Sequence, residues 1–174
     1  MREIDPSELQ IRPFHLLDKE WALLVGGKDK PNPMTVSWGG FGTLWEHPVV
    51  TVYVRPTRHT FGLLKEDPSF TLNILPEGHR KTLDFCGSES GREVNKWKAC
   101  GIHPAPSSCV PVPRVSEAEL AVECRVVATM QVDPGRFLDR SLEQLYPKRD
   151  YHTAFVGHVL TVWAADRFLR KAGA

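Results

Sequence analysis

Short apolar runs that are rich in β-branched residues alternate with turn residues along this chain. The clearest run, residues 49–54 (VVTVYV), lies between Pro48 and Pro56 and predicts a strand that ends at Arg55. Similar patterns predict strands at residues 21–27, 34–38, 69–75, 119–132 and 153–165. The first two of these are separated by the turn sequence KDKPNP, so we expect them to form a hairpin.

Short helices are expected between the strands. Residues 60–66 predict one or two helical turns with Thr60 as the N-cap, ending at the pair Asp67 and Pro68. Further helices are predicted at residues 79–85, at residues 94–99 and around residues 140–146. Residues 102–113 contain four prolines, which exclude a regular element and predict an extended loop.

About six strands with short helices between them, and no regular alternation of strand and helix, predict a mainly β protein with a largely antiparallel barrel. We expect a single domain over residues 1–174, because a chain of this length buries one sizeable core. The fourteen prolines and thirteen glycines agree with the many short connections of such a barrel.

Charge and cysteine content narrow the choice of partner and compartment. The formal net charge of +1 gives no broad basic field, so a small phosphorylated ligand is expected rather than a nucleic acid. No apolar run approaches the roughly 18 to 20 residues that cross a bilayer, so no membrane insertion is expected.

The four cysteines form no C-x-x-C pair, and the opening MREIDPSELQ is too polar for a secretory signal. We therefore expect reduced thiols and a cytoplasmic protein.

The segment 32–42 (NPMTVSWGGFG) is a candidate for binding a planar ligand. Its glycines allow close approach of the backbone, and Thr35 and Ser37 add hydroxyl groups beside aromatic rings. An aromatic heterocycle suits such a surface. The alternative is a barrel strand whose glycines mark a bulge or a tight bend.

The segment 55–60 (RPTRHT) is the best candidate anion site in the sequence. It lies where a predicted strand runs into a predicted helix, so the free amides of a helix N-terminus would adjoin the guanidinium groups of Arg55 and Arg58. The hydroxyl of Thr60 adds a further group for a phosphate. The alternative is a solvated basic turn. Neither a P-loop motif nor a dinucleotide-binding glycine motif is present.

The segment 86–92 (CGSESGR) predicts a loop of small polar residues whose backbone amides line a ligand, with Lys96 adding a positive charge nearby. The alternative is a serine-rich surface turn and a solvated lysine. The first residue of this segment, Cys86, is an isolated cysteine, and such residues are more often small buried apolar groups than nucleophiles.

The seven histidines show neither H-x-x-x-H nor H-E-x-x-H spacing, so no metal site is predicted. His152 closes the polar segment 134–152, which is a candidate for shaping a substrate side. Two interpretations of His152 stay open, a substrate contact and a surface loop histidine.

Four segments, in this order, resemble the flavin-reductase-like, flavoredoxin-type family: NPMTVSWGG at 32–40, VYVRPTRHT at 52–60, FTLNIL at 70–75 and DFCGSESGR at 84–92. The resemblance extends over residues 21–168 and is densest between residues 32 and 96. It implies an FMN-binding split β-barrel with short peripheral helices, and a homodimer with FMN near the subunit interface.

The same resemblance implies roles for residues in the matching motifs. The residues that would border the isoalloxazine ring are Thr35, Val36, Ser37 and Trp38. Those that would hold the phosphate are Arg55, Arg58 and Thr60. Those that would line the other side are Cys86, Gly87, Ser88 and Ser90, with Lys96 beside the flavin ring, where a positive charge favours the reduced form.

The family's usual chemistry is hydride transfer from NADH or NADPH to flavin, followed by transfer to free flavin, a ferric chelate or a protein partner. The hydride step needs no acid or base from the protein, so no catalytic residue is predicted. The resemblance implies an FMN-dependent NAD(P)H oxidoreductase. Two alternatives stay open: an FMN-carrying electron-transfer protein reduced by a protein partner, and a split-barrel binding module without flavin.

Overall fold

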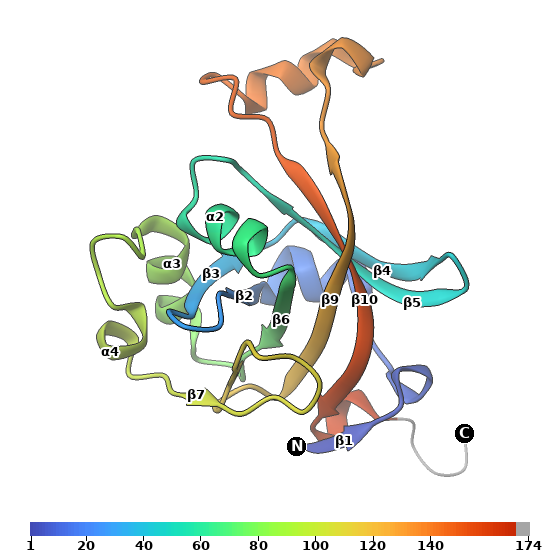
Figure 1. Cartoon of the computed structure of the whole chain (residues 1–174), viewed down its shortest axis with the longest axis vertical. Coiled ribbons are helices and arrows are strands. Elements are labelled where there is room, and N and C mark those ends of the chain that lie inside the picture. The colour runs from blue at the N-terminus through green and yellow to red at the C-terminus, as the bar shows by residue number, and fades with distance from the viewer. Residues whose placement is uncertain (170–174) are drawn as a thin grey trace.

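An antiparallel sheet of eight strands dominates the computed structural model, which describes residues 1–169 (Figure 1). Its strands are β1 (Arg2–Ile4), β2 (Ala22–Gly26), β3 (Asn32–Val36), β4 (Gly39–Leu44), β5 (His47–Val54), β6 (Ser69–Ile74), β9 (Leu120–Gln131) and β10 (Thr153–Ala164). They are ordered β3-β2-β6-β9-β10-β5-β4, and β1 also pairs with β10. The predicted mainly β, largely antiparallel architecture is confirmed.

The strands predicted from the hydrophobic pattern are present, and within the eight-stranded sheet the pattern missed two others. β2 and β3 form the expected hairpin, with Leu24 opposite Met34. β5 begins two residues earlier than predicted and includes Pro48, while β9 and β10 pair along most of their length. The missed strands are β1 and β4. Residues 39–44 include three glycines, which weakens a strand pattern, so β4 is defined by its pairing with β5.

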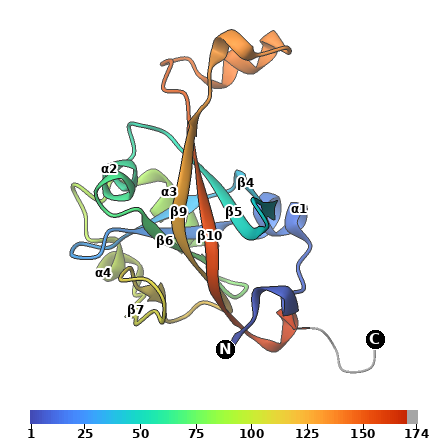
Figure 2. The ribbon, with the colours of Figure 1, turned by 45° about the vertical axis from the view of Figure 1, so that its right-hand side comes forward.

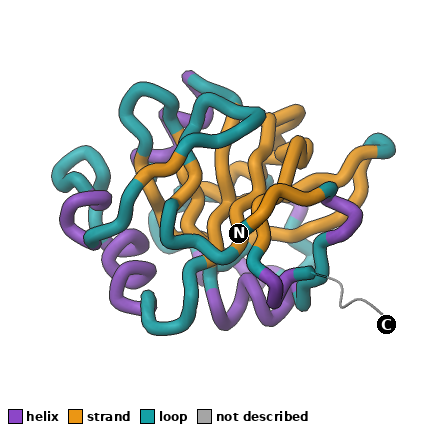
Figure 3. The backbone as a smooth tube through the Cα atoms, turned by 90° about the horizontal axis from the view of Figure 1, so that it is seen from below, coloured by secondary structure: helices purple, strands orange, loops and turns teal. Residues whose placement is uncertain are grey.

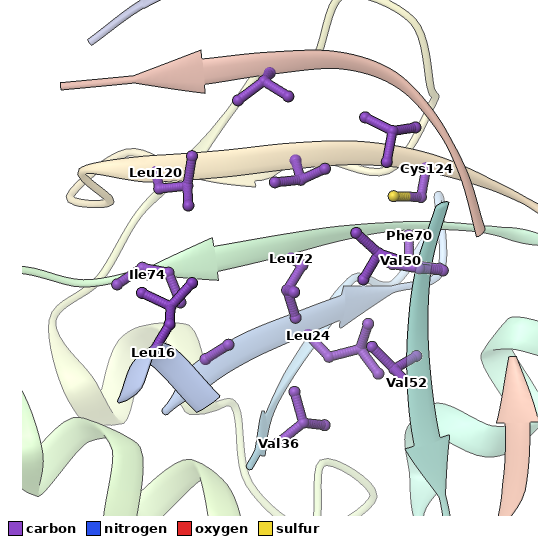
Figure 4. Packing of buried hydrophobic residues seen from close by; sticks show 14 of the residues in the cluster. Leu16, Leu24, Val36, Val50, Val52, Phe70, Leu72, Ile74, Leu120 and Cys124 are labelled. Carbon is purple, nitrogen blue, oxygen red and sulfur yellow. The ribbon is translucent and has the colours of Figure 1, made fainter. Parts of the chain in front are cut away.

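The main core lies between the strands of this curved sheet, as Figure 4 shows from close by. Phe70 on β6 is fully buried there, and Gly157 on β10 leaves room for its ring. A Cβ atom at Gly157 would lie 2.5 Å from Phe70 Cζ, closer than real Cβ contacts. The pairing of β9 and β10 shifts register between Val156 and Gly157 at this point. The ring of Phe70 therefore packs against the paired strands β9 and β10 at the one point where residue 157 has no side chain.

A second apolar cluster packs on the opposite face of β2. Leu24 points into the main core, whereas its neighbours Leu23 and Val25 point into the second cluster. Successive strand residues face opposite sides, so β2 is apolar throughout and every residue in it is buried. This second cluster joins β2 to Leu83 of α3 (Arg80–Ser88) and to Ile102. Helix α3 is thereby held against the sheet.

The proline-rich residues 102–113 form the predicted extended loop, apart from a two-residue strand, β7 (Pro104–Ala105), paired with β8 (Arg114–Val115). Glu123 on β9 is fully buried and holds this loop. Its carboxylate accepts hydrogen bonds from the backbone amides of Ser108 and Cys109 and from the indole of Trp163. These three hydrogen bonds stabilise the Glu123 carboxylate, which would be costly to bury without partners.

Short helices surround the strands (Figure 3). They are α1 (Pro13–His15), α2 (His59–Glu66), α3 and α4 (Lys96–Cys100), with a π-helical turn (Leu16–Glu20) after α1 and 3-10 turns at Pro6–Glu8 and Asp166–Phe168.

The N-cap predicted for α2 was wrong: Arg58 precedes the helix and Thr60 lies in its first turn. The Thr60 hydroxyl accepts a hydrogen bond from the Asn32 side chain at 2.8 Å, so it serves tertiary packing instead of a cap.

The loop predicted to begin at Cys86 was also wrong at its start. Helix α3 continues to Ser88, and the Glu89 amide still donates to the Phe85 carbonyl. Gly87 in this turn packs against Thr35: a Cβ atom there would lie 3.4 Å from Thr35 Cβ, an ordinary packing distance. The predicted helix that Gly101 closes is confirmed as α4, and Gly101 has a left-handed backbone with φ of 62°.

Residues 132–152 form an arm that projects beyond the sheet between β9 and β10 (Figures 1 and 2). The helix expected near residue 140 is the 3-10 helix Arg140–Leu145, which follows a 3-10 turn at Pro134–Arg136. Leu138 at the arm's tip is fully exposed. None of the helices in residues 1–169 is long and apolar enough to cross a membrane.

Candidate functional site

Two adjoining pockets lie where β3, the segment after β5 and the end of α3 meet. The larger pocket, of about 300 Å³, is lined by Met34, Thr35, Val36, Ser37, Trp38, Tyr53, Val54, Arg55, Arg58, Gly87 and His152. The smaller pocket, of about 70 Å³, is lined by Asn32, Met34, Thr57, Arg58, His59, Thr60, Ser88, Glu89, Ser90, Gly91 and Lys96. Because Met34 and Arg58 line both, the two pockets form one continuous candidate site.

The larger pocket brings together the four residues predicted to border a planar ring. Thr35, Val36, Ser37 and Trp38 follow one another from β3 into the turn before β4, and all four line the pocket. The Thr35 hydroxyl donates to the Leu83 carbonyl at 2.5 Å, which fixes β3 against α3. Trp38 remains 43% exposed, so one wall of the pocket is an accessible aromatic surface. Residues 35–38 of the candidate segment 32–42 therefore line a pocket with an accessible aromatic wall, while residues 39–42 belong to β4.

The smaller pocket contains two cationic side chains. Lys96 is buried, and its ammonium donates to the Cys86 carbonyl at 2.8 Å. Arg58 is half-buried, with its guanidinium donating to the Gly87 carbonyl. Within residues 1–169 neither cation lies within ion-pair distance of a carboxylate. Burial lowers the pKa of Lys96, and burial together with the charge of Arg55 lowers the pKa of Arg58. A bound anion would relieve both costs.

The framework of the smaller pocket is closely packed. The buried Asn32 side chain donates to Thr60 in the first turn of α2, which ties β3 to that helix. Gly91 passes directly over Asn32, since a Cβ atom there would lie 1.9 Å from Asn32 Oδ1. Any larger residue at this crossing would displace the buried Asn32 side chain. Ser88 and Ser90 complete this side of the pocket.

Arg55 is not placed with Arg58 in the smaller pocket. It lines the larger pocket and forms an ion pair with Asp150 on the arm, with 2.7 Å between Nη1 and Oδ1. Its guanidinium also donates to the Leu145 carbonyl and lies 4.9 Å from the ring centroid of Tyr146. Three groups of the arm thus engage the side chain that the resemblance had assigned to a phosphate.

Cys86 does not line either pocket. Its side chain is fully buried in the second apolar cluster, because it lies in the last turn of α3 and points toward Leu83 and Ile102. Its neighbour Gly87 lines the larger pocket. Lys96 lies in the smaller pocket with Arg58 and Thr60, whereas the resemblance had associated it with the flavin ring.

His152 reaches the wall of the larger pocket from the base of the arm. Its ring lies 5.0 Å from Trp38, between ring centroids, and its Nδ1 is 2.9 Å from the hydroxyl of Tyr146. Burial, with a smaller contribution from Arg55, lowers the pKa of His152 to about 4, so the imidazole is neutral near pH 7. It therefore offers a neutral polar group beside an aromatic wall.

Sequence reasoning missed several residues of the site. Asn32 and Met34 stand in the candidate segment 32–42 but were assigned no role, because nothing in their residue types distinguished a pocket wall from a strand. Tyr146 and Asp150 lie about ninety residues from Arg55 and carry no motif, so only the fold associates them with it. In the described part of the chain, no group of three or more potential metal ligands is assembled.

Residues 21–171 match the family described as flavin reductase like domain. The chain belongs to this family. The resemblance drawn from four ordered motifs is thereby confirmed, and the family match includes every residue that lines the two pockets. The first strand and the turns up to residue 20 precede the matched region.

Solved structures of other proteins in the comparison share the fold. Flavoredoxin of Desulfovibrio vulgaris (Miyazaki F) superposes with a TM-score of 0.69 at 22% identity, covering 98% of this chain and 80% of its own. An FMN-binding protein from Thermus thermophilus, with bound 1-cyclohex-2-enone, gives 0.68 at 24% identity, with 100% and 83% covered. The Streptomyces globisporus NADH:FAD oxidoreductase SgcE6 gives 0.67 at 17% identity, with 86% and 77% covered. The expected split β-barrel is confirmed.

Proposed function

We propose that this protein binds FMN and acts as an NAD(P)H-dependent oxidoreductase of the flavin reductase type. The observation that carries the proposal is the pair of cations, Arg58 and Lys96, which lack a carboxylate partner in the described chain and adjoin an aromatic-walled pocket. A flavin mononucleotide has matching parts, a phosphate dianion and a planar ring. The larger pocket is at the lower end of the volume range of small-molecule sites.

The residues of the smaller pocket fit a phosphate. Arg58 and Lys96 supply charge, the first turn of α2 adds the backbone amides of His59 and Thr60, and Ser88 and Ser90 supply hydroxyl groups. The residues 35–38 and Gly87 would hold the ring in the larger pocket. When bound, FMN would accept a hydride and pass the electrons on, and the protein's part is to bind and orient it.

We assign Arg55 to the ring side of the site. Its ion pair with Asp150 and its contact with Tyr146 attach the arm to the wall of the larger pocket. In this position Arg55 orients the arm and presents a positive charge to a bound flavin without being the main phosphate ligand.

We propose that His152 contacts the nicotinamide or another substrate. Its neutral imidazole faces the same pocket as Trp38 and is held by Tyr146. A neutral ring of this kind contacts an aromatic or amide-bearing substrate without placing a further charge next to Arg55. His152→Gln is then expected to raise KM for the substrate more than it lowers kcat, in steady-state assays with saturating FMN.

A homodimer is the assembly we propose, supported by apolar side chains along the arm. Leu138, Leu142 and Leu145 on the arm, and Met130 near the end of β9, are exposed in the single chain. Such a group of apolar side chains on a projecting element is typical of an association surface. Light scattering coupled to gel filtration tests it, and a monomer at micromolar concentration would contradict it.

A second candidate function is an FMN-carrying electron-transfer protein that a protein partner reduces. The likeness to flavoredoxin, with a TM-score of 0.69, is the reason to keep this candidate beside the oxidoreductase, whose structural counterpart gives 0.67. Both functions require the same flavin site, so the fold alone does not choose between them.

An anaerobic visible spectrum separates the candidates. Purified protein loaded with FMN is mixed first with NADH, then with NADPH, and finally with dithionite. Flavin absorbance that bleaches with a pyridine nucleotide at a catalytic rate supports the oxidoreductase, and bleaching with dithionite alone supports the carrier. Protein that stays colourless and takes up no added FMN would overturn both and favour a binding module without flavin.

A further inference from the structure

Two cysteines lie in contact directly behind the smaller pocket. The sulfur atoms of Cys86 and Cys100 are 3.9 Å apart. Cys86 is fully buried in the last turn of α3, and Cys100 is the last, partly exposed residue of α4. The other two cysteines are unlike this pair: Cys109 is exposed, and Cys124 is buried in the main core.

The two sulfurs are near enough to bond after a small movement. A disulfide has an S–S length of about 2.05 Å, so the sulfurs must approach by roughly 2 Å. Helix α4 is fixed at its start, where Asn95 caps it and the Trp97 indole donates to the Pro31 carbonyl at 2.7 Å. At its other end the amides of Gly101 and Ile102 donate to the carbonyls of Lys98 and Trp97, so the sulfurs are expected to approach mainly by rotation of the two cysteine side chains.

The pair is directly connected to the proposed phosphate site. The Cys86 carbonyl accepts the hydrogen bond from Lys96, and the next carbonyl, that of Gly87, accepts the one from Arg58. The segment between the two cysteines carries Ser88 and Ser90. A bond between the sulfurs would therefore close a loop that contains most of one wall of the smaller pocket.

We propose that Cys86 and Cys100 form a redox-active thiol pair that a peroxide oxidises to an intramolecular disulfide, and that this disulfide weakens anion binding in the smaller pocket. The second part rests on the proposed function, because it takes the anion to be the FMN phosphate. In a reducing compartment the dithiol form prevails, and peroxide shifts it to the disulfide.

The difference in exposure between Cys86 and Cys100 determines which thiol reacts first with peroxide. Burial, and then the neighbouring Cys100, raise the pKa of Cys86 to about 12, so the more accessible Cys100 reacts first. The Cys100 thiolate attacks the O–O bond and becomes a sulfenic acid, while water leaves. The Cys86 sulfur then displaces the hydroxyl group, and its proton leaves with that group as a second water. Two thiols and one peroxide thus give one disulfide and two waters.

Intact mass and peptide mapping test the thiol pair without any flavin. The full-length Cys109→Ser variant, fully reduced and then treated with hydrogen peroxide, is expected to lose the mass of two hydrogen atoms. Tryptic peptides 82–92 and 99–114 are expected to be joined, each then carrying a single cysteine. The matched control adds Cys100→Ser, which is expected to give no such bond. A Cys109→Ser protein that keeps both thiols, or a control that still loses two hydrogens, would overturn the pair.

A titration then tests the link to the pocket. We expect the oxidised Cys109→Ser protein to bind FMN about tenfold more weakly than the reduced protein, the scale of disturbing a hydrogen bond to a charged group. Reduction with dithiothreitol is expected to restore the affinity, and Cys109→Ser/Cys100→Ser to show no change with peroxide. Equal affinities of both redox forms would overturn the link. If neither form binds FMN, the proposed function fails, while the mass measurement still decides the thiol pair.

Discussion

Arg55 and Arg58 are three residues apart in the chain, and the structure gives them opposite situations. Arg55 already has an anionic partner, Asp150, at 2.7 Å, together with a carbonyl and an aromatic ring. Arg58, and Lys96 beside it, donate only to backbone carbonyls and a methionine sulfur. The comparison shows that a basic motif does not identify its own ligand-binding residue. In the proposed function, the cation left without a carboxylate is the one that binds the anion.

The largest expected effect comes from removing the cations that lack a carboxylate partner. Arg58→Ala or Lys96→Met is expected to weaken FMN binding by about 1.5 to 3 kcal/mol, the scale of a hydrogen bond to a charged group, or roughly tenfold to more than a hundredfold. Fluorescence titration of the apoprotein measures it.

The control for these variants is Lys98→Met, which removes an exposed lysine from the same helix as Lys96. It is expected to bind FMN as tightly as the original protein, because Lys98 contributes to the local structure through its backbone amide and carbonyl, which the substitution leaves in place. A loss of affinity equal to that of Lys96→Met would mean that general positive charge, rather than this pocket, attracts the cofactor.

A smaller effect is expected from disturbing the framework behind Arg58. Gly91→Ala places a Cβ atom on the Asn32 side chain and is expected to break its hydrogen bond to Thr60. We expect about tenfold weaker FMN binding and a lower melting temperature, from overpacking of about 1 to 3 kcal/mol.

Gly62→Ala provides the comparison for that substitution, since nothing lies within 4 Å of its added Cβ and the position is inside α2. It is expected to keep FMN affinity and to gain up to about 1 kcal/mol of stability from helix propensity. Calorimetry and titration of both variants separate loss of the pocket from loss of the fold.

On the Arg55 side of the site, His152 is expected to make the stability of the folded protein depend on pH. The folded protein holds the pKa of His152 at about 4, below its ordinary value of 6.5, so the unfolded chain binds more protons between these values. The stability from neutral His152 is present above pH 6.5 and is lost as the pH falls toward 4. Melting temperatures of the original protein are thus expected to fall more steeply over this window than those of His152→Gln. Parallel curves would contradict the buried, neutral histidine.

The smallest effect on the cofactor is expected at Asp150. Asp150→Asn removes the charge opposite Arg55 and is expected to change FMN affinity by no more than about threefold, the scale of a partly exposed ion pair. The arm is expected to become more sensitive to limited proteolysis. A loss of FMN affinity as large as that of Arg58→Ala would reverse the assignment of the two arginines.

Local patterns predicted much of the barrel because they record which faces of each strand are buried. The run of residues 49–54 and the hairpin of β2 and β3 were correctly placed for this reason. β4 was missed because its glycines carry no hydrophobic pattern, and its strand geometry comes from pairing with β5. The end of α3 was misplaced since Gly87 and Ser88 favour a loop by themselves, whereas contact with Thr35 and the second core continues the helix.

The sequence by itself determined the family, the barrel class and the segments that meet at the site, because these depend on residue types in a fixed order. Only the tertiary structure decided which side chain of each segment faces the pocket. Cys86 turned into the core beside Cys100, Arg55 was paired by an arm about ninety residues away, and Lys96 was buried next to Arg58. Direction, burial and charge pairing arise from contacts between distant segments, and no local pattern records those contacts.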